Sequence, residues 1–304
     1  MSKIIVVAGP TAVGKTEYAI EIAKTFNGEI VSCDSMQLYK YMDIGSAKPT
    51  ADEQAAVKHY LVDEIDPKEE FSVAIYQKMA KEAISEILNK GKIPVIAGGT
   101  GLYLNSILYD MDFGKTQENK AIRAKYEEIA YKQGVDALYE ILKEKDPDAA
   151  TRIHKNNVKK VIRAIEAVEV SGKKLNDFKT DIKPNKDYDP IMICLNRDRE
   201  ELYDRINRRV DILVENGLLD EVKGLMDMGF TSENIAMKGI GYKEIIDYFN
   251  GDYDLDFAIN LVKRNTRRYA KRQITWFKRY EDMKWFNLSE DNLEEIISWI
   301  KRKL

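Results

Sequence analysis

The sequence has little of what secreted, zinc-binding or membrane proteins are built from. Its 304 residues include only two cysteines, Cys33 and Cys194, which excludes a disulfide scaffold. The two histidines, His59 and His154, cannot be grouped with those cysteines at any usual zinc-ligand spacing. No apolar run approaches the roughly 18 residues that a membrane helix needs. We therefore expect a soluble protein that does not enter a membrane. Because no signal-peptide pattern precedes the first β-like run, we expect it in the cytoplasm.

The sequence also has almost no net charge. Its 48 Lys and Arg residues stand against 51 Asp and Glu residues, for a formal charge of −3, and that total argues against a nucleic-acid partner. The distribution of charge argues the opposite. Residues 263–279 carry eight positive charges and no acid, which leaves −11 on the rest of the chain. A solvated face is the ordinary alternative for a charge run, but such faces normally mix signs because like charges repel at i,i+4.

Two basic segments lie far apart along the chain. Within 263–279, spacings of three and four put one basic set on a single side of a helix, namely Arg264, Arg268, Lys271 and Arg272. The interleaved Tyr269, Trp276 and Phe277 either stack on bases or pack in the core. A second acid-free stretch contains Arg152, Lys155, Lys159, Lys160 and Arg163. Two basic surfaces suit a folded polyanion such as structured RNA better than a mononucleotide.

Short apolar runs alternate with helical periodicity along the first third of the chain. Strands are expected at 3–8, 29–33, 93–97 and 191–195. Helices are expected at 16–26, 71–89, 200–215, 218–228, 242–249, 257–279 and 293–303, so that everything after Arg199 is helical. This alternation predicts an α/β fold with a parallel sheet and covering helices. Only helical periodicity follows residue 115, and a polar, lysine-rich stretch follows that. We therefore expect a helical insertion domain at 115–189 within a core domain made of 1–114 and 190–304.

The first strand runs directly into a phosphate-binding sequence. Residues 9–16, GPTAVGKT, match G-x-x-x-x-G-K-[ST] between a strand and a helix, which is the setting that this motif requires. Backbone N–H groups of such a loop hold phosphate oxygens, and the helix N-terminus adds a favourable dipole. The expected phosphate-binding residues are Gly9, Thr11, Ala12, Val13, Gly14, Lys15 and Thr16, with the Thr16 hydroxyl as the Mg²⁺ ligand. The pattern predicts a P-loop NTPase-like core rather than a glycine-rich turn without a ligand.

A carboxylate follows the second strand but not the third. ATPases and kinases of this type commonly place a Mg²⁺-holding Asp at the end of a further apolar strand. The strand at 93–97 ends instead in GGTG. Asp34 follows the strand at 29–33, at the edge where open α/β sheets bind ligands. It is either a metal-associated carboxylate or a general base that acts on an acceptor.

Five segments occur together and in order. They are GPTAVGKT (9–16), DSMQLY (34–39), GGTGLY (98–103), GIGYKE (239–244) and RQITWF (272–277). In this combination the chain resembles the bacterial tRNA dimethylallyltransferase (isopentenyl-tRNA transferase) family over nearly its whole length. The resemblance implies transfer of a dimethylallyl group from dimethylallyl diphosphate to tRNA, with release of diphosphate. The acceptor would be the N6 amine of the adenosine immediately 3′ of the anticodon.

The resemblance also implies roles for individual residues. Lys15, together with Mg²⁺ at the Thr16 hydroxyl, would stabilise the charge that develops as the allylic C–O bond breaks. Asp34 would be the general base for the adenine amine, and Thr100 would lie near the leaving oxygen and the acceptor. By the same resemblance, Arg205 and Arg209 lie on a helix that closes over the diphosphate.

On the RNA side, the implied partner is the anticodon stem-loop of tRNA. Its adenosine would flip into a pocket lined by Ser35, Met36 and Gln37, at little cost in a loop that is already partly unpaired. The residues expected to contact tRNA are Asp34, Ser35, Met36, Gln37, Thr100, Arg123, Lys159, Lys160, Arg163, Lys271 and Arg272. We expect a monomer, because the sequence has no obvious exposed apolar seam.

Two other functions are compatible with parts of the pattern. A small-molecule P-loop kinase would use the same loop and an arginine-rich helix, and it would bind ATP tightly and transfer phosphate. A non-catalytic RNA-binding protein could use the loop only to sense a nucleotide. In that case Asp34→Ala would leave every measurable activity unchanged.

Overall fold

The computed structural model describes residues 1–111, 119–172 and 183–304. The chain divides into two compact units, the first made of Met1–Leu108 with Asn185–Leu304 and the second of Tyr109–Pro184. The expected start of the insertion at residue 115 and the first half of the lysine-rich stretch before residue 189 lie outside the described residues. At the other boundary, strand β5 (Tyr188–Asn196) already begins before residue 189.

The first unit is built on a sheet of six strands in the order β3-β2-β4-β1-β5-β6. The remaining strands are β1 (Ser2–Ala8), β2 (Gly28–Cys33), β3 (His59–Tyr60), β4 (Ile93–Gly98) and β6 (Lys284–Asn287). β1 lies in the centre, where Ile5 pairs with Val95 of β4 on one side and with Ile191 of β5 on the other. The neighbouring strands of this sheet pair in parallel. The predicted parallel α/β sheet is therefore confirmed.

The sequence patterns miss the two strands at the edges of this sheet. β3 has two residues, too few to show any period. β6 has four residues and lies between two helices, so the expectation of helix throughout the chain after Arg199 is wrong. Pairing with a neighbouring strand holds both in place, through His59 beside Ile30 and Trp285 beside Cys194. Such pairing is a tertiary effect, which local periodicity does not record.

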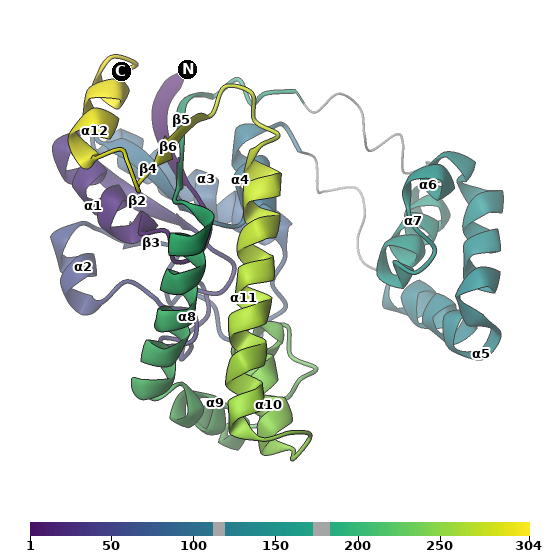
Figure 1. Cartoon of the computed structure of the whole chain (residues 1–304). Helices are drawn as coiled ribbons and strands as arrows, with labels where there is room; N and C mark the ends of the chain where they lie inside the picture. Colours follow the sequence, from purple (N-terminus) through teal and green to yellow (C-terminus); the bar gives the residue numbers. More distant parts are fainter. Residues whose placement is uncertain (112–118, 173–182) are drawn as a thin grey trace. The chain divides into compact units, whose positions relative to one another are not determined.

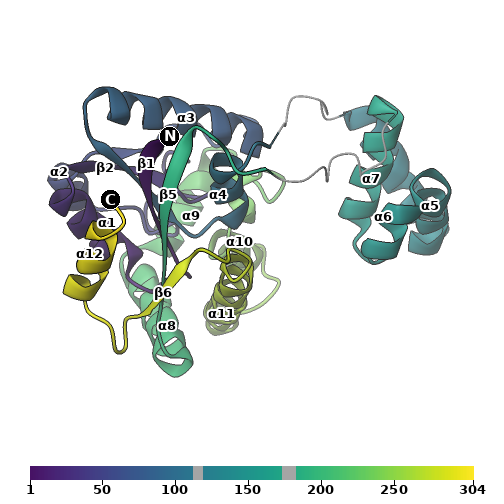
Figure 2. The ribbon, with the colours of Figure 1, turned by 90° about the horizontal axis from the view of Figure 1, so that it is seen from above.

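Helices cover both faces of the sheet (Figure 2). α1 (Lys15–Thr25) and α12 (Leu293–Lys301) share a cluster of buried apolar side chains with β1 and β5 on one face. α3 (Val73–Asn89) packs against β2 and β4 on the other face, beside α4 (Gly101–Leu108). A short helix, α2 (Ala51–Ala56), follows β2. Each fully buried Val, Leu or Ile in these layers stabilises the fold by about 1.5–3 kcal/mol.

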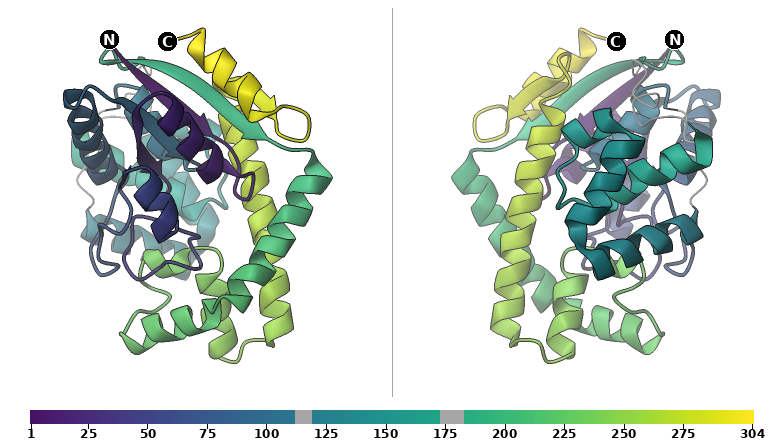
Figure 3. Two further views of the ribbon diagram at one scale, coloured as in Figure 1. Left: turned by 90° about the vertical axis from the view of Figure 1, so that its left-hand side faces the viewer. Right: turned by 90° about the vertical axis from the view of Figure 1, so that its right-hand side faces the viewer.

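A helical layer reaches beyond the carboxyl edge of the sheet (Figures 1 and 3). Two long helices, α8 (Arg199–Glu215) and α11 (Leu255–Phe277), pack against each other there. They are connected through α9 (Leu218–Asp227), a 3₁₀ turn (Ala236–Lys238) and α10 (Tyr242–Phe249). These bounds confirm the expected helices to within two residues at either end. The layer lies where open α/β sheets bind their ligands.

The second unit is helical and has a core of its own. It contains α5 (Lys120–Lys145), α6 (Pro147–Arg152) and α7 (Val158–Ser171). Their buried side chains, among them Leu138, Leu142, Val161 and Ile165, form one cluster. α5 is interrupted at Gly134, whose φ of 88° is not helical. In neither unit does the described chain contain a helix long and apolar enough to cross a membrane.

Candidate active site

The phosphate-binding loop has the backbone conformation that its glycines predict. Gly9 follows β1 with a φ of 155°, and Gly14 has a φ of 108°. A side chain at Gly9 would place its Cβ 2.6 Å from the carbonyl oxygen of Leu195, so the neighbouring strand leaves no room for one. Ala12, inside the loop, also has a positive φ of 63°. Lys15 opens α1, and its Nζ donates to the Pro10 carbonyl at 2.8 Å.

Side chains from two later helices hold the loop from outside. Arg205 of α8 donates from its Nε to the Ala12 carbonyl at 3.0 Å. Arg197, just before α8, donates from its Nε to the Val13 carbonyl at 3.0 Å. From α11, the buried Gln273 accepts from the Thr11 N–H at 2.9 Å and donates to the Gly99 carbonyl at 2.9 Å. The shape of the loop therefore depends on α8 and α11.

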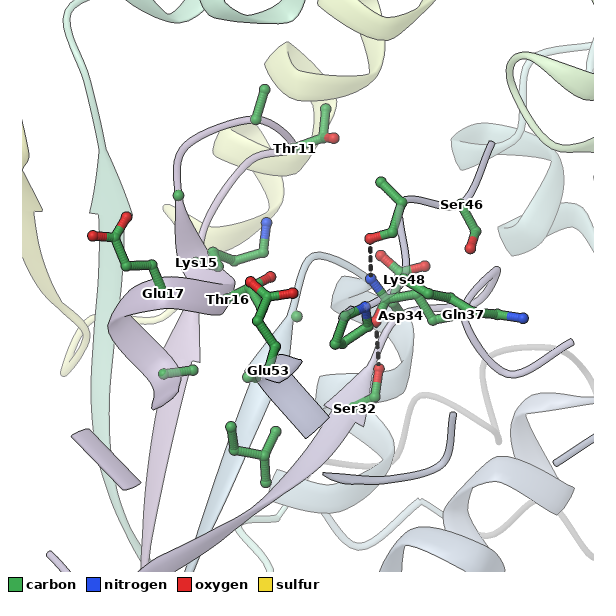
Figure 4. Close-up of a pocket in the computed structure, with 18 of the residues that line it drawn as sticks. Thr11, Lys15, Thr16, Glu17, Ser32, Asp34, Gln37, Ser46, Lys48 and Glu53 are labelled. Atoms are coloured by element: carbon green, nitrogen blue, oxygen red, sulfur yellow. Dashed lines mark hydrogen bonds between the residues drawn. The ribbon is translucent and has the colours of Figure 1, made fainter. Parts of the chain in front are cut away.

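A cleft of about 350 Å³ opens in front of the loop. Lys15, Thr16, Asp34 and Glu53 line it (Figure 4). Arg209 lines it as well. The pKa of Lys15 is lowered to about 8, mainly by burial and in smaller part by the neighbouring Arg209, while the charge of Asp34 acts in the opposite direction. Burial also lowers the pKa of Arg209. A site with two desolvated cations is electrostatically suited to an anion with several charges.

Asp34 lies where the ends of β2 and β4 meet. Its Oδ1 accepts from the Met36 N–H at 2.9 Å, which fixes the carboxylate in a tight turn. Thr100 donates its N–H to the Cys33 carbonyl at 3.1 Å, and its Oγ1 accepts from the Ser35 N–H at 3.1 Å. The two strand ends approach so closely that a Cβ on Gly98 would lie 2.1 Å from the Cys33 carbonyl oxygen. Thr100 and Asp34 are thus positioned by one pair of adjoining turns.

A second cavity, of about 420 Å³, lies on the far side of Asp34 and is mostly apolar. Ser35 and Met36 line it with an aromatic cluster in which Phe71 packs edge-on against Tyr39 and Tyr103, with ring centroids 6.3 and 6.4 Å apart. Six residues line both this cavity and the phosphate cleft, namely Thr11, Asp34, Ser46, Ala47, Arg209 and Tyr269. We call these six residues the neck. A cleft suited to an anion and an apolar cavity therefore meet at one carboxylate.

Not every residue predicted for the adenine pocket lies in the apolar cavity. Gln37 lines the phosphate cleft instead, where its Oε1 accepts from the Ser32 hydroxyl at 3.0 Å and its Nε2 donates to the Ala47 carbonyl at 3.2 Å (Figure 4). Thr100 lines neither cavity and contacts the neck through Tyr269, with which its side chain forms a hydrogen bond. Arg205 contacts the phosphate loop itself, and Arg209 lines both cavities.

The basic residues of α11 divide into two groups. Arg264, Arg268, Lys271 and Arg272 are exposed. Lys263 and Arg267 are half-buried and bind α8, through an ion pair with Asp211 at 2.6 Å and a hydrogen bond to Asn207. Of the interleaved aromatic residues, Phe277 is buried, and Trp276 lies where a Cβ on Gly101 would approach its ring within 2.2 Å. Phe277 therefore packs in the core, and the half-buried Trp276 packs against the start of α4.

In the second unit, Lys159, Lys160 and Arg163 are exposed on α7. Arg123 differs from them, because its Nε donates to both carboxylate oxygens of the buried Glu166, at 3.0 and 3.1 Å. That carboxylate also accepts the Asn119 N–H at 2.7 Å. Arg123 therefore ties the start of α5 to α7.

Three residues at the site have no part in the sequence prediction of the phosphate site. They are Arg197, Gln273 and Tyr269. Arg197 follows directly on a predicted strand, the position from which a side chain reaches the carboxyl edge of a sheet. Tyr269 and Gln273 are four residues apart, so they share one face of α11. That spacing is the sequence signal from which their common position could be predicted. Their partners, Thr100 and Thr11, are more than 160 residues distant and cannot be read from a pattern.

The donor set near the loop is suited to Mg²⁺ rather than to a softer metal. No group of three or more His, Cys, Asp or Glu side chains that could hold a metal is present among the described residues. The cleft does contain the Thr16 hydroxyl and the carboxylates of Glu17, Asp34 and Glu53. Mg²⁺ commonly takes one or two protein oxygens and completes its shell with substrate phosphates and water. Thr16 fits that requirement when a diphosphate is bound.

Comparison with known proteins gives consistent results. Residues 37–280 match the model of the family described as IPP transferase. The tRNA dimethylallyltransferase of Alkaliphilus oremlandii is 53% identical over 299 residues, which are 97% of this chain and 96% of that protein. The enzyme of the same name from Clostridioides difficile is 54% identical over 294 residues, 96% of this chain and 94% of that protein.

Two solved structures are also similar. The full-length tRNA isopentenylpyrophosphate transferase of Bacillus halodurans matches with a TM-score of 0.76 at 43% identity, over 100% of this chain and 97% of that one. A eukaryotic dimethylallyltransferase, captured in crystallographic snapshots acting on tRNA, matches with a TM-score of 0.81 at 31% identity, over 95% of this chain and 75% of that one.

Proposed function

The chain belongs to the IPP transferase family, and we propose that prenyl transfer to tRNA takes place at the neck between its two cavities. The reaction moves a dimethylallyl group from dimethylallyl diphosphate to the N6 amine of the adenosine immediately 3′ of the anticodon, and it releases diphosphate. The observation that carries this proposal is the position of Asp34, with a cationic phosphate cleft on one side and an apolar cavity on the other.

The phosphate cleft holds the diphosphate of the donor. Lys15 and Arg209 neutralise its charge, and backbone N–H groups at the start of α1 bind its oxygens. Arg205 keeps the loop in shape through the Ala12 carbonyl. Mg²⁺, held by the Thr16 hydroxyl and the phosphates, supplies further charge neutralisation as the leaving group departs. These groups are set in place before the reaction, so they stabilise the developing charge without reorganising.

The apolar cavity holds the adenine, with Ser35 and Met36 at its wall. An adenine amine is a weak nucleophile because its lone pair is delocalised into the ring. Asp34 takes a proton from N6 as the C–N bond forms, which is the work of a general base. Its hydrogen bond from the Met36 N–H aims the carboxylate. Thr100 supports the neck from behind through Ser35 and Tyr269.

Exposed lysine and arginine side chains of α11 and α7 bind the RNA. Lys271 and Arg272 lie on the same helix as the neck residue Tyr269, and Arg272 also lines the apolar cavity. On α7, Lys159, Lys160 and Arg163 offer a second basic surface. Arg123 contributes to RNA binding indirectly. Its Nε is held by Glu166, so it fixes the position of α5 against α7. Because one chain lines both cavities, a monomer suffices for the reaction. Because its substrate is tRNA, the enzyme is proposed to work in the cytoplasm.

The low pKa of Lys15 predicts how donor binding depends on pH. Above pH 8 the free enzyme holds a neutral Lys15 and must take up a proton to bind the diphosphate, whose phosphates are fully ionised there. KM for dimethylallyl diphosphate should therefore rise about tenfold per pH unit above pH 8. Lys15→Arg keeps its charge throughout this range, so its KM should stay flat to pH 10. A flat profile for the unmodified enzyme would show that Lys15 does not change its protonation on binding.

The exposed face of α11 predicts a salt-dependent loss of tRNA affinity. Arg272→Ala or Lys271→Ala should weaken binding of an anticodon stem-loop and reduce the slope of log Kd against log salt by about 1. A matched control is Lys301→Ala, because that lysine is exposed on α12 and lines neither cavity. Fluorescence anisotropy between 50 and 200 mM salt measures both. Equal slopes for all variants would remove α11 from the RNA interface.

A two-label experiment tests the proposed reaction against the kinase alternative. The enzyme is incubated with an unmodified tRNA transcript, Mg²⁺ and either dimethylallyl diphosphate labelled in its allyl group or ATP labelled in its terminal phosphate. We expect labelled RNA from dimethylallyl diphosphate. From ATP we expect no transfer of the labelled phosphate. Label from ATP alone would identify a kinase, and label from neither donor would contradict the proposal.

A further inference from the structure

The neck contains an aromatic ring in addition to its carboxylate and its cation. Among the six residues that line both cavities, the aromatic one is Tyr269, on the fourth turn of α11. Its side chain is partly buried. Burial, with the nearby charge of Asp34 as the next cause, raises the pKa of its hydroxyl to about 12, so the ring is a neutral phenol at physiological pH.

Three groups surround this ring. Its hydroxyl forms a hydrogen bond with the side chain of Thr100, which follows β4. The carboxylate of Asp34 lies in the same neck. The guanidinium of Arg272 lies 5.6 Å from the ring centroid, in cation–π contact, so a face of this ring already attracts a cation in the free protein.

The proposed reaction passes a second, transient cation through this neck. As the allylic C–O bond breaks, its electron pair goes to the diphosphate oxygen, and positive charge spreads over the allyl carbons. The N6 lone pair then completes the bond to C1, and the amine proton goes to the Asp34 carboxylate. The electron-poor carbons must cross from the phosphate cleft to the adenine, and the residues that line both cavities surround that path.

We propose that the face of the Tyr269 ring stabilises the positive charge that develops on the allyl group, which makes Tyr269 a catalytic residue of this enzyme. The inference rests on the proposed function. It also gives Arg272 a second role: when its guanidinium pairs with a phosphate of bound tRNA, it leaves the ring face to the allyl group. The neck would then become competent for transfer only when the acceptor is present.

Ring fluorination at position 269 tests this directly. Each fluorine withdraws density from the π face and weakens cation–π attraction while it barely changes the size of the ring. Tyr269→Phe serves as the baseline, since it removes the hydroxyl and its bond to Thr100. Phenylalanine derivatives with one, two and three ring fluorines are then incorporated at the same position in the full chain. The readout is the single-turnover rate of transfer, with Kd for dimethylallyl diphosphate and for tRNA measured in parallel.

The rate should fall stepwise with each fluorine, by about tenfold from none to three, while both Kd values stay constant. A rate that is independent of fluorination would overturn the role of the ring, even if Tyr269→Leu is slow, because that loss would then reflect packing. The two proposals fail separately. If the unmodified enzyme transfers no dimethylallyl group, the proposed function is wrong. If it does transfer the group but the rate does not change along the fluorinated series, only the proposed role of Tyr269 is wrong.

Discussion

Asp34→Ala should lower the single-turnover rate of prenyl transfer by about 10²–10⁴-fold, the range for a general base, and leave tRNA binding unchanged. The carboxylate faces the neck and makes its hydrogen bond within its own turn, so its removal takes away a proton acceptor without breaking a contact between helices. Asp34→Asn should lose a similar factor, because an amide still accepts the Met36 N–H but cannot take a proton. Rapid-quench measurement with labelled donor gives the rate.

A second aspartate provides a matched control for this variant. Asp66 is half-buried and accepts the Lys68 N–H at 2.9 Å, the same i to i+2 bond that Asp34 makes to Met36, but it lines neither cavity. Asp66→Ala should therefore transfer at the normal rate. If Asp34→Ala lowers the single-turnover rate no more than Asp66→Ala does, Asp34 is not the general base.

The second large effect is expected at Lys15. Lys15→Met removes a preset positive charge from the leaving group, and loss of one such group costs about 10²–10³-fold in rate. The side chain contacts the loop through one bond, from Nζ to the Pro10 carbonyl, so the fold should tolerate the change. Burial already opposes the charged form of Lys15, and thermal stability should not fall.

The comparison for this variant is on the same helix. Lys24 is exposed at the end of α1 and pairs only with Glu21 among the ion pairs of the described chain, so Lys24→Met should leave the rate unchanged. Affinity for tRNA should be the same in both variants. A Lys15→Met enzyme that turns over within a few-fold of normal would indicate that the loop binds its ligand elsewhere than at the reacting end.

Features encoded within a few residues could be predicted from the sequence. The strand, the glycine loop and the helix that follow one another at 3–26 each have their own local signal, and the structure confirms all three. The long amphipathic helices after Arg199 are of the same kind. β3 and β6 are different, because a two- or four-residue edge strand exists only where a partner strand already offers hydrogen bonds.

The candidate site shows the same division. Asp34 and Lys15 could be placed from sequence because each follows the end of a strand at a fixed distance. Gln37 could not, since its direction depends on the Ser32 hydroxyl and the Ala47 carbonyl. Charge counting alone does not show that Lys263 and Arg267 of α11 are engaged by α8, or that Arg123 is held by Glu166. Which cations face the RNA is decided by their neighbours in space.

The most direct test of the central claim is the chemical position of the transferred group. Labelled dimethylallyl diphosphate is incubated with the enzyme, Mg²⁺ and two anticodon stem-loops that differ only in the nucleotide immediately 3′ of the anticodon, adenosine in one and guanosine in the other. The RNA is then digested and its nucleosides are separated. We predict one labelled nucleoside, N6-dimethylallyl adenosine, from the first stem-loop and none from the second. Equal labelling of both stem-loops, or no labelling at saturating Mg²⁺, would contradict this account.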